Sequence, residues 1–287
     1  MTPDMPGLDA MPAPAFVAAL GDLFEHSPWV AERVAGSRPF GSARALHDAM
    51  MAAVRAAAPG EQLALLRAHP ELAGREASDG VLTADSGTEQ GRLGFDRLSP
   101  ADHAELAALN RAYQDRFGFP CIVALARHDT RAAVLDAMRA RLGANPAAEQ
   151  ATALAEVGHI TEARLARRLG RVGGSLSIHA LDTAKGGAAP GLAFSLHRQE
   201  RGGWRCLLSG CTNAQGRTDG PLLAGLDMEP GAYRIDYEVG AYHRAAHGEG
   251  GRFLDIVPIA FCVDAPGEHY HVPLQFTPWA YGTYRGG

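Results

Sequence analysis

The sequence has few cysteines and no long hydrophobic run, and both absences narrow what the chain can be. Its 287 residues include four cysteines without C-x-x-C spacing, so neither a zinc ribbon nor a dithiol redox site is expected. No apolar stretch approaches the roughly 20 residues that a membrane-spanning helix needs. The first residues also lack the basic and apolar segments of a secretory signal. We therefore expect a reduced, cytoplasmic protein that does not enter the membrane.

The sequence also lacks the basic runs that bind nucleic acid. It carries 27 Lys and Arg against 32 Asp and Glu, a net charge of -5, with no basic stripe. No glycine-rich phosphate loop and no zinc-like ligand cluster is present, so we expect neither a cofactor nor a metal. A chain that is 46% hydrophobic and 21% charged can bury globular cores, and its length suits two domains.

Hydrophobic residues in the first half recur with helical spacing. Phe16, Leu20 and Leu23 form one such stripe. Ser99 followed by Pro100 predicts an N-cap with proline in the first helical position. Further helices are expected to begin after Ser42, after Thr130 and at about Pro146. About six helices without alternating strands predict an all-α domain over residues 1–169.

The hydrophobic period then changes from the helical value to two. Leu176, Ile178 and Ala180 alternate with more polar neighbours. The same alternation recurs over residues 233–239, 257–263 and 270–276. Short strands separated by Gly, Pro and Asp turns are typical of a sandwich of antiparallel sheets. We predict a Gly-rich linker at 170–174 with a hinge at Gly173–Gly174, followed by an all-β domain over 175–287.

Two polar segments interrupt the helical pattern, residues 67–74 and 84–90. His69 precedes a proline, which favours an extended backbone at a helix end, where a side chain can be presented to a ligand. The residue types alone favour an ordinary solvated helix terminus with capping residues. The alternatives are therefore a binding site and a capped helix end.

These segments resemble a known family, the OHCU decarboxylases, where OHCU is 2-oxo-4-hydroxy-4-carboxy-5-ureidoimidazoline. The resemblance covers about residues 10–168 and rests on EHSPWVAE (25–32), HPELAG (69–74), SGTEQ (86–90) and RFGFP (116–120). It implies an all-α fold without a cofactor, a catalytic His69, and a Glu89 that assists catalysis or orients the substrate. It also implies substrate contacts from Pro70, Ser86, Gln90, Ile122, Ala124 and Arg164. Cys121 stands where relatives often have Phe, which affects the expected pocket shape.

Decarboxylation of this substrate suits a histidine without a metal. Loss of CO2 leaves charge that the conjugated imine and carbonyl of the substrate can absorb. An imidazole, with a usual pKa of about 6.5, exchanges protons near neutrality. Two roles stay open for His69, namely proton donor and carboxylate-positioning group.

Several histidines of the second half lie on strand faces opposite the apolar residues. His179 and His271 alternate with core positions, so their side chains do not join the core by default. They could be ordinary surface histidines. They could also belong to a metal site with His269, or with the His243–His247 pair, although no acidic or thiolate ligands accompany them.

This half resembles the 5-hydroxyisourate hydrolases, the enzymatic branch of the transthyretin fold. The resemblance covers about residues 174–287 and rests on LSIHALDT (176–183), TNAQGRTD (212–219), HYHVPL (269–274) and TYRG (283–286). It implies that His179, Arg217 and His271 are catalytic, that Tyr284 and Arg285 shape the substrate pocket, and that this domain forms a homotetramer. Gln215 and Gly287 depart from the usual Asp and Ser.

Hydrolysis of a ring amide needs an activated water and a stabilised oxyanion. A histidine pair can act as base and acid, and Arg217 is a permanent cation with a planar fork. No Ser/His/Asp pattern is present, so a covalent acyl-enzyme is not expected.

The two resemblances concern consecutive reactions, because hydrolysis of 5-hydroxyisourate yields OHCU. We therefore expect a bifunctional enzyme of urate degradation that acts on these two small molecules and produces (S)-allantoin. The alternatives are a transthyretin-like binding protein with a helical scaffold and a metal-dependent cyclic amidohydrolase.

Overall fold

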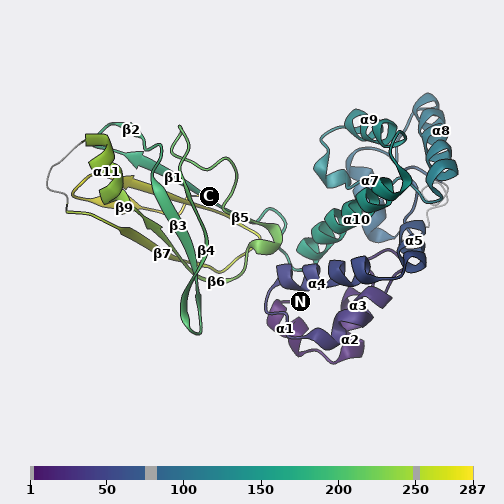
Figure 1. Ribbon diagram of the computed structural model, residues 1–287, viewed down its shortest axis with the longest axis horizontal. Coiled ribbons are helices and arrows are strands. Elements are labelled where there is room, and N and C mark those ends of the chain that lie inside the picture. The colour runs from purple at the N-terminus through teal and green to yellow at the C-terminus, as the bar shows by residue number, and fades with distance from the viewer. Residues whose placement is uncertain (1–2, 75–82, 248–252, 287) are drawn as a thin grey trace. The chain divides into compact units, whose positions relative to one another are not determined.

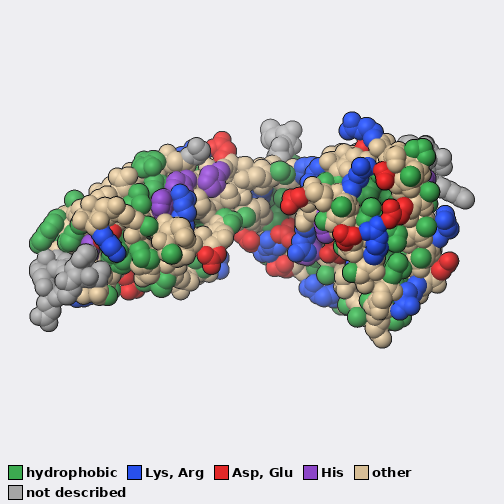
Figure 2. Space-filling model, turned by 90° about the horizontal axis from the view of Figure 1, so that it is seen from above, with side chains coloured by type: hydrophobic (Ala, Val, Ile, Leu, Met, Phe, Trp, Pro, Cys, Tyr) green, Lys and Arg blue, Asp and Glu red, His purple; other side chains and the backbone are tan. Residues whose placement is uncertain are grey.

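The computed structural model describes residues 3–74, 83–247 and 253–286, and residues outside these ranges are grey in Figure 1 and Figure 2. The chain divides into two compact units, Met1–Leu169 and Gly170–Gly287. The first unit is helical and the second consists mainly of strands, so the predicted fold class is confirmed. No helix among the described residues is long and apolar enough to cross a membrane.

The helical unit contains more helices than the sequence pattern predicted. They are α1 (Met5–Ala10), α2 (Ala13–Leu20), α3 (Trp29–Val34), α4 (Ala43–Ala56), α5 (Pro59–Arg67), α7 (Ala84–Arg92), α8 (Pro100–Phe117), α9 (Arg131–Arg141) and α10 (Pro146–Arg168). The helix starts predicted at Ser42, Ser99 and Thr130 are confirmed, because the hydroxyl of each accepts a backbone N–H of the helix that follows. Several of the additional helices are too short to show a hydrophobic period.

Helix α10 forms the centre of this unit. Its residues Ala153, Val157 and Leu165 are fully buried, and the helix contacts α4, α5 and α8. The N-terminal part of this core comes from Phe16 and Leu20, two residues of the stripe predicted from the sequence. Arg164, near the end of α10, is thereby held inside the unit rather than on its surface.

The second unit is a sandwich of two sheets. Its strands are β1 (Ser175–Asp182), β2 (Gly187–Ala188), β3 (Ala193–Glu200), β4 (Gly203–Cys211), β5 (Leu223–Ala224), β6 (Gly231–Tyr237), β7 (Val257–Val263), β8 (His269–Phe276) and β9 (Tyr281–Thr283). One sheet has the order β2-β1-β8-β9 with β5 also on β1, and the other has the order β4-β3-β6-β7. A helix that the sequence pattern did not predict, α11 (Val239–His247), follows β6.

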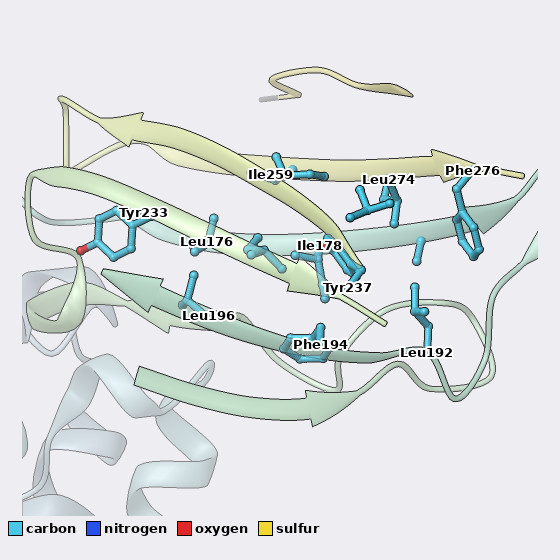
Figure 3. Packing of buried hydrophobic residues seen from close by; sticks show 14 of the residues in the cluster. Leu176, Ile178, Leu192, Phe194, Leu196, Tyr233, Tyr237, Ile259, Leu274 and Phe276 are labelled. Carbon is cyan, nitrogen blue, oxygen red and sulfur yellow. The ribbon is translucent and has the colours of Figure 1, made fainter. Parts of the chain in front are cut away.

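The alternating apolar residues of the two sheets meet in one core. Figure 3 shows Leu176, Phe194, Tyr237 and Leu274 among the side chains that pack between the sheets. The prediction of wholly antiparallel sheets is wrong for one pair, because β1 and β8 run parallel. These strands are joined through the rest of the unit rather than by a hairpin, and the hydrophobic period does not record direction.

The segment 170–174 is packed against the β unit. The guanidinium of Arg171 is buried and pairs with both carboxylate oxygens of Glu229 at 2.7 and 2.8 Å. A Cβ on Gly174 would lie 1.8 Å from the Pro266 carbonyl oxygen. This close packing argues against a free hinge at Gly173–Gly174.

The Arg171–Glu229 pair predicts where a stable β fragment must begin. A fragment of residues 173–287 lacks Arg171 and so loses its ion pair with the buried Glu229 carboxylate, and breaking a buried pair costs about 3–5 kcal/mol. We expect its urea midpoint to lie well below that of a fragment of residues 170–287. In the longer fragment, Arg171→Ala should reproduce the loss, whereas Val172→Ala, at an exposed position, should not. Equal midpoints for the two fragments would contradict this role.

Candidate active sites

Seven of the residues predicted for the helical unit line one cavity. They are His69, Pro70, Ser86, Glu89, Gln90, Ile122 and Arg164. Leu72, Cys121, Val123, Leu125 and Ile160 complete the wall. The cavity measures about 40 Å³ and is partly open to solvent.

Helix α7 supplies three of these residues from one face. Ser86, Glu89 and Gln90 are spaced i, i+3 and i+4, which places them on the same side of a helix. Thr83 caps this helix by accepting the Ser86 N–H at 3.3 Å. Its own hydroxyl donates to the Glu25 carboxylate at 2.7 Å, which ties the start of α7 to the cavity.

His69 is held as a neutral ring at the cavity wall. Its Nδ1 lies 2.9 Å from the Leu65 carbonyl oxygen, so Nδ1 carries the proton and donates it. Its Nε2 is buried and has no hydrogen-bond partner among the described residues. Burial lowers the pKa of His69 to about 4, and the Leu65 contact opposes this only in part. Near neutral pH the ring therefore presents an unpaired acceptor nitrogen.

Arg164 is the centre of the charged network in this cavity. Its Nε and one terminal nitrogen contact Glu89 at 3.0 and 2.9 Å, and its other terminal nitrogen contacts Glu25 at 2.8 Å. The Ser86 hydroxyl and the Leu23 carbonyl oxygen accept hydrogen bonds from the two remaining N–H groups of the guanidinium. All five N–H donors of the guanidinium are thus engaged. A substrate carboxylate can reach Arg164 only by displacing one of these partners.

Glu25 was not assigned a role from the sequence, although it begins the EHSPWVAE motif. The carboxylate is buried and accepts hydrogen bonds from Thr83, Ser86 and Arg164. Burial alone would raise the pKa of Glu25, but the bonds from Thr83 and Arg164 outweigh it and hold the pKa below its usual value. The position of Glu25 inside a family motif was the one signal in the sequence that could have indicated a role for it.

The backbone groups predicted to face the substrate are already engaged. The Ile122 carbonyl accepts from Arg141 at 2.6 Å, and the Ala124 N–H donates to Glu156 at 2.6 Å. Ala124 does not line the cavity, although its neighbours Val123 and Leu125 do. These bonds to α9 and α10 fix the segment that carries Ile122.

Gln90 holds the loop after His69. Its Oε1 accepts the Ala73 N–H at 2.9 Å, and its Nε2 donates to the Glu71 carbonyl at 3.3 Å. In this structure the amide thus positions the HPELAG segment. A direct contact with substrate would require one of these bonds to be exchanged.

A second, larger hollow of about 720 Å³ is also bordered by His69. Arg67, Glu71, His103 and Arg111 are among its lining residues. It contains none of the other predicted site residues. The smaller cavity, which gathers an acid, a guanidinium and the free Nε2 of His69, is therefore the candidate active site.

In the β unit, His179, His269 and His271 lie on the outward face of the β1–β8 pair. The ring centres of His179 and His271 are 6.4 Å apart, and those of His269 and His271 are 6.3 Å apart. Figure 2 shows histidine side chains gathered on one face of this unit beside a basic side chain. His179 and His271, which the sequence pattern placed away from the core, thus lie near each other on this face.

Arg217 comes from the turn after β4, which is locked onto β1. The Gly216 carbonyl accepts the Ala180 N–H at 2.8 Å, and a Cβ on Gly216 would lie 2.3 Å from the Ala180 carbonyl oxygen. Burial and then the charge of Arg217 lower the pKa of both His179 and His271. Both imidazoles are therefore neutral near pH 7, with a permanent cation close by.

The C-terminal segment completes this face. Gly286 exchanges both backbone hydrogen bonds with His271, at 3.0 and 2.9 Å. A Cβ on Gly286 would lie 3.0 Å from Cδ2 of the imidazole, so the backbone packs directly on the ring. The β8–β9 register places Tyr284 across from Pro273, on the same face as His271.

Arg285 lies on the opposite face of this segment. Its guanidinium stacks 4.3 Å from the centre of the Tyr270 ring and pairs with Glu268. Tyr270 belongs to the core, so Arg285 does not lie beside the imidazoles in this structure. Gly287 lies outside the described residues.

The structure also bears on the metal alternative. Among the described residues, no group of three or more His, Cys, Asp and Glu side chains is placed to hold an ion. The His247 side chain lies outside the described part. His269 and His271 contact serine hydroxyls rather than a common point between the rings.

Comparisons with known proteins divide the chain in the same way as its structure. Residues 9–166 match a family model described as OHCU decarboxylase, and residues 176–286 match one described as the HIUase/Transthyretin family. A 2-oxo-4-hydroxy-4-carboxy-5-ureidoimidazoline decarboxylase of Haloferax volcanii is 43% identical over 154 residues, covering 54% of this chain and 89% of the relative. A 5-hydroxyisourate hydrolase of Ralstonia nicotianae is 42% identical over 115 residues, covering 39% of this chain and 98% of the relative.

One solved structure matches both halves together. A crystal structure of (S)-allantoin synthase is 31% identical in sequence, with a TM-score of 0.52. The match covers 99% of this chain and 100% of the synthase chain.

Proposed function

Because the chain belongs to the OHCU decarboxylase family over residues 9–166 and to the HIUase/transthyretin family over residues 176–286, we propose that it catalyses two consecutive steps of urate degradation. The β unit hydrolyses 5-hydroxyisourate to OHCU, and the helical unit decarboxylates OHCU to (S)-allantoin. One observation carries this proposal, namely the presence in one chain of two separate polar constellations, each within its own family match.

In the decarboxylation, the helical cavity positions the substrate and moves a proton. When the carboxylate leaves as CO2, its electron pair enters the conjugated imine of the ring, and a proton must then be added to one face. His69 presents an acceptor Nε2, which accepts a hydrogen bond or proton from the substrate hydroxyl and returns a proton from that face. Arg164 binds the carboxylate when Glu89, the less buried of its two acidic partners, gives way.

In the hydrolysis, water attacks a ring carbonyl and the carbon–nitrogen bond opens. The neutral imidazoles of His179 and His271 can accept the proton of that water, and Arg217 stabilises the oxyanion. Tyr284 and Gly286 border the same face, which suits a flat, oxo-substituted ring.

We also propose that the β unit assembles a homotetramer. Trp279, Tyr281 and Tyr284 are 63%, 46% and 58% exposed, and exposed aromatic side chains are typical of interfaces.

The free cysteines support a reducing compartment such as the cytoplasm.

The function is tested by adding the purified protein to freshly generated 5-hydroxyisourate. We expect its ultraviolet spectrum to convert quickly to that of OHCU and then to decay as OHCU is consumed. A binding protein would leave both spontaneous decay rates unchanged. A metal-dependent amidohydrolase would lose hydrolysis in the presence of a chelator and regain it with added metal.

Glu25→Gln should impair decarboxylation because Arg164 then loses one of its two carboxylate partners. We expect at least a roughly tenfold loss of kcat/KM for OHCU, since a broken buried charge pair is worth several times RT. Hydrolysis of 5-hydroxyisourate, measured on the same preparation, should not change. Glu32→Gln, at an exposed acid of α3, is the matched control. A normal rate of decarboxylation by Glu25→Gln would contradict a role for Glu25 in the active site.

The rate of decarboxylation should not change with pH in the range near 6.5, where an ordinary histidine titrates. The folded pKa of His69 is about 4, below its usual 6.5, so the neutral ring persists as the pH falls through 6. We expect a flat profile of kcat/KM from pH 8 to about 5.5, and a decline with a midpoint near 6.5 would contradict it. Stability should fall from pH 6.5 toward 4, because only the unfolded chain protonates His69 in that range.

A further inference from the structure

A row of four polar side chains runs from His271 to the edge of the histidine face. The Ser177 hydroxyl lies 2.9 Å from His271 Nδ1 and 3.2 Å from His269 Nε2. The Ser175 hydroxyl lies 2.7 Å from His269 Nδ1. The four groups thus form one continuous chain of hydrogen bonds, in the order His271, Ser177, His269 and Ser175.

The parallel register of β1 and β8 creates this row. It places Ser177 opposite His271 and Ser175 opposite His269. Since side chains two residues apart in a strand share a face, all four lie on the outward side of the sheet. His271 is partly buried, whereas His269 is exposed, so the row leads from the candidate site toward solvent.

Such a chain can be polarised in two directions. A serine hydroxyl and a neutral imidazole can each donate one hydrogen bond while accepting another. When the donors point away from His271, its Nδ1 carries the proton and its Nε2 is a base. When every donor is reversed, Nε2 carries the proton and is an acid. Moving one proton along the row therefore converts His271 from base to acid.

We propose that His269, acting through Ser177, stores the proton that His271 takes from the attacking water and returns it to the leaving nitrogen. This inference rests on the proposed hydrolase function. The water proton adds to His271 Nε2, the Nδ1 proton passes to Ser177, and the Ser177 proton passes to His269, which becomes the cation. The hydroxide forms the new carbon–oxygen bond. The carbon–nitrogen bond then breaks, the proton returns along the row, and Nε2 delivers it to the ring nitrogen.

The charges around the row favour this direction. Burial and the neighbouring Arg217 and His179 lower the pKa of His271, so a cation there is disfavoured. His269 is exposed, and beyond it the Glu268 carboxylate pairs with Arg285. Ser175 and Ser177 are the β1 residues that face the two rings.

The test uses the full chain and separates proton storage from packing. Ser177→Ala interrupts the row, and His269→Ala removes its outer imidazole. Both should lower kcat for 5-hydroxyisourate by roughly tenfold or more, up to the 10²–10⁴-fold that general acid–base groups contribute, with KM almost unchanged. Ser177→Thr, which keeps the hydroxyl, should retain nearly normal kcat. Decarboxylation of supplied OHCU should be normal in all three variants.

Added imidazole provides the readout that a structural role would not change. Because position 269 is exposed, imidazole in solution should restore kcat of His269→Ala as its concentration rises. It should not restore Ser177→Ala, in which the connection to His271 is missing. Normal kcat in His269→Ala, or a loss that imidazole does not restore, would overturn the proposal. Absence of hydrolysis by the unsubstituted protein would instead refute the hydrolase function.

Discussion

His69→Ala should reduce decarboxylation of OHCU by roughly 10²–10⁴-fold, the range that a positioned acid–base group contributes. The reason is the unpaired Nε2 at the wall of the cavity that also holds Arg164 and Glu89. Hydrolysis of 5-hydroxyisourate should be unchanged, because none of the hydrolase residues belongs to the helical unit. With urate and a urate oxidase as the source, OHCU should accumulate and decay slowly to racemic allantoin.

A matched histidine distinguishes the two hollows that border His69. His103 lies in the larger hollow, away from Glu89 and Arg164. His103→Ala should therefore decarboxylate OHCU at nearly the normal rate. Near-normal OHCU consumption by His69→Ala, or an equal loss in His103→Ala, would show that the smaller cavity is not the reaction site.

Deleting the chain from Tyr284 onward should remove most of the hydrolase activity and leave decarboxylation of supplied OHCU intact. Chain ends are usually mobile and tolerant of deletion. Here Gly286 makes two backbone hydrogen bonds to His271 and packs on its ring, so the deletion frees the imidazole on one side. Losing an oriented acid–base group costs roughly 10²-fold or more. Kinetics with both substrates, and light scattering for the mass of the assembly, measure the outcome.

Two point variants refine this deletion. Gly286→Ala places a methyl group 3.0 Å from Cδ2 of His271 and should lower hydrolysis by displacing the ring. Arg285→Ala should have the smaller effect, because its guanidinium lies on the other face against Tyr270. Unchanged hydrolysis after the deletion would contradict the role of the segment, and equal loss of both activities would indicate misfolding.

Capping residues and the spacing of hydrophobic residues predicted those helices and strands whose formation depends on residues close together in the sequence. Ser42, Ser99 and Thr130 cap helices because a hydroxyl reaches N–H groups two or three residues ahead, which is a property of the local sequence. The alternation around Ile178 likewise predicted a strand with one buried face. Helix α11 was missed because Val239 continues the alternation of β6 into the start of the helix, and the shortest helices are too short to show a period.

Long-range pairing explains what the sequence did not predict. Glu25 and Arg164 are 139 residues apart, and only the folded helical unit brings their charges to 2.8 Å. The parallel register that aligns Ser177 with His271 depends on strands from opposite ends of the β unit. Motif resemblance implies that Arg285 shapes the substrate pocket, whereas in this structure its guanidinium stacks on Tyr270.

The central claim, that one chain carries both reactions in sequence, is tested most directly by circular dichroism of the allantoin formed from urate. Urate and a urate oxidase supply 5-hydroxyisourate in the cuvette, with or without the protein. With the protein, the dichroism of (S)-allantoin should appear within minutes. Without it, the signal should stay near zero as racemic product forms slowly. A racemic product, or the same slow time course in both cuvettes, would contradict the account.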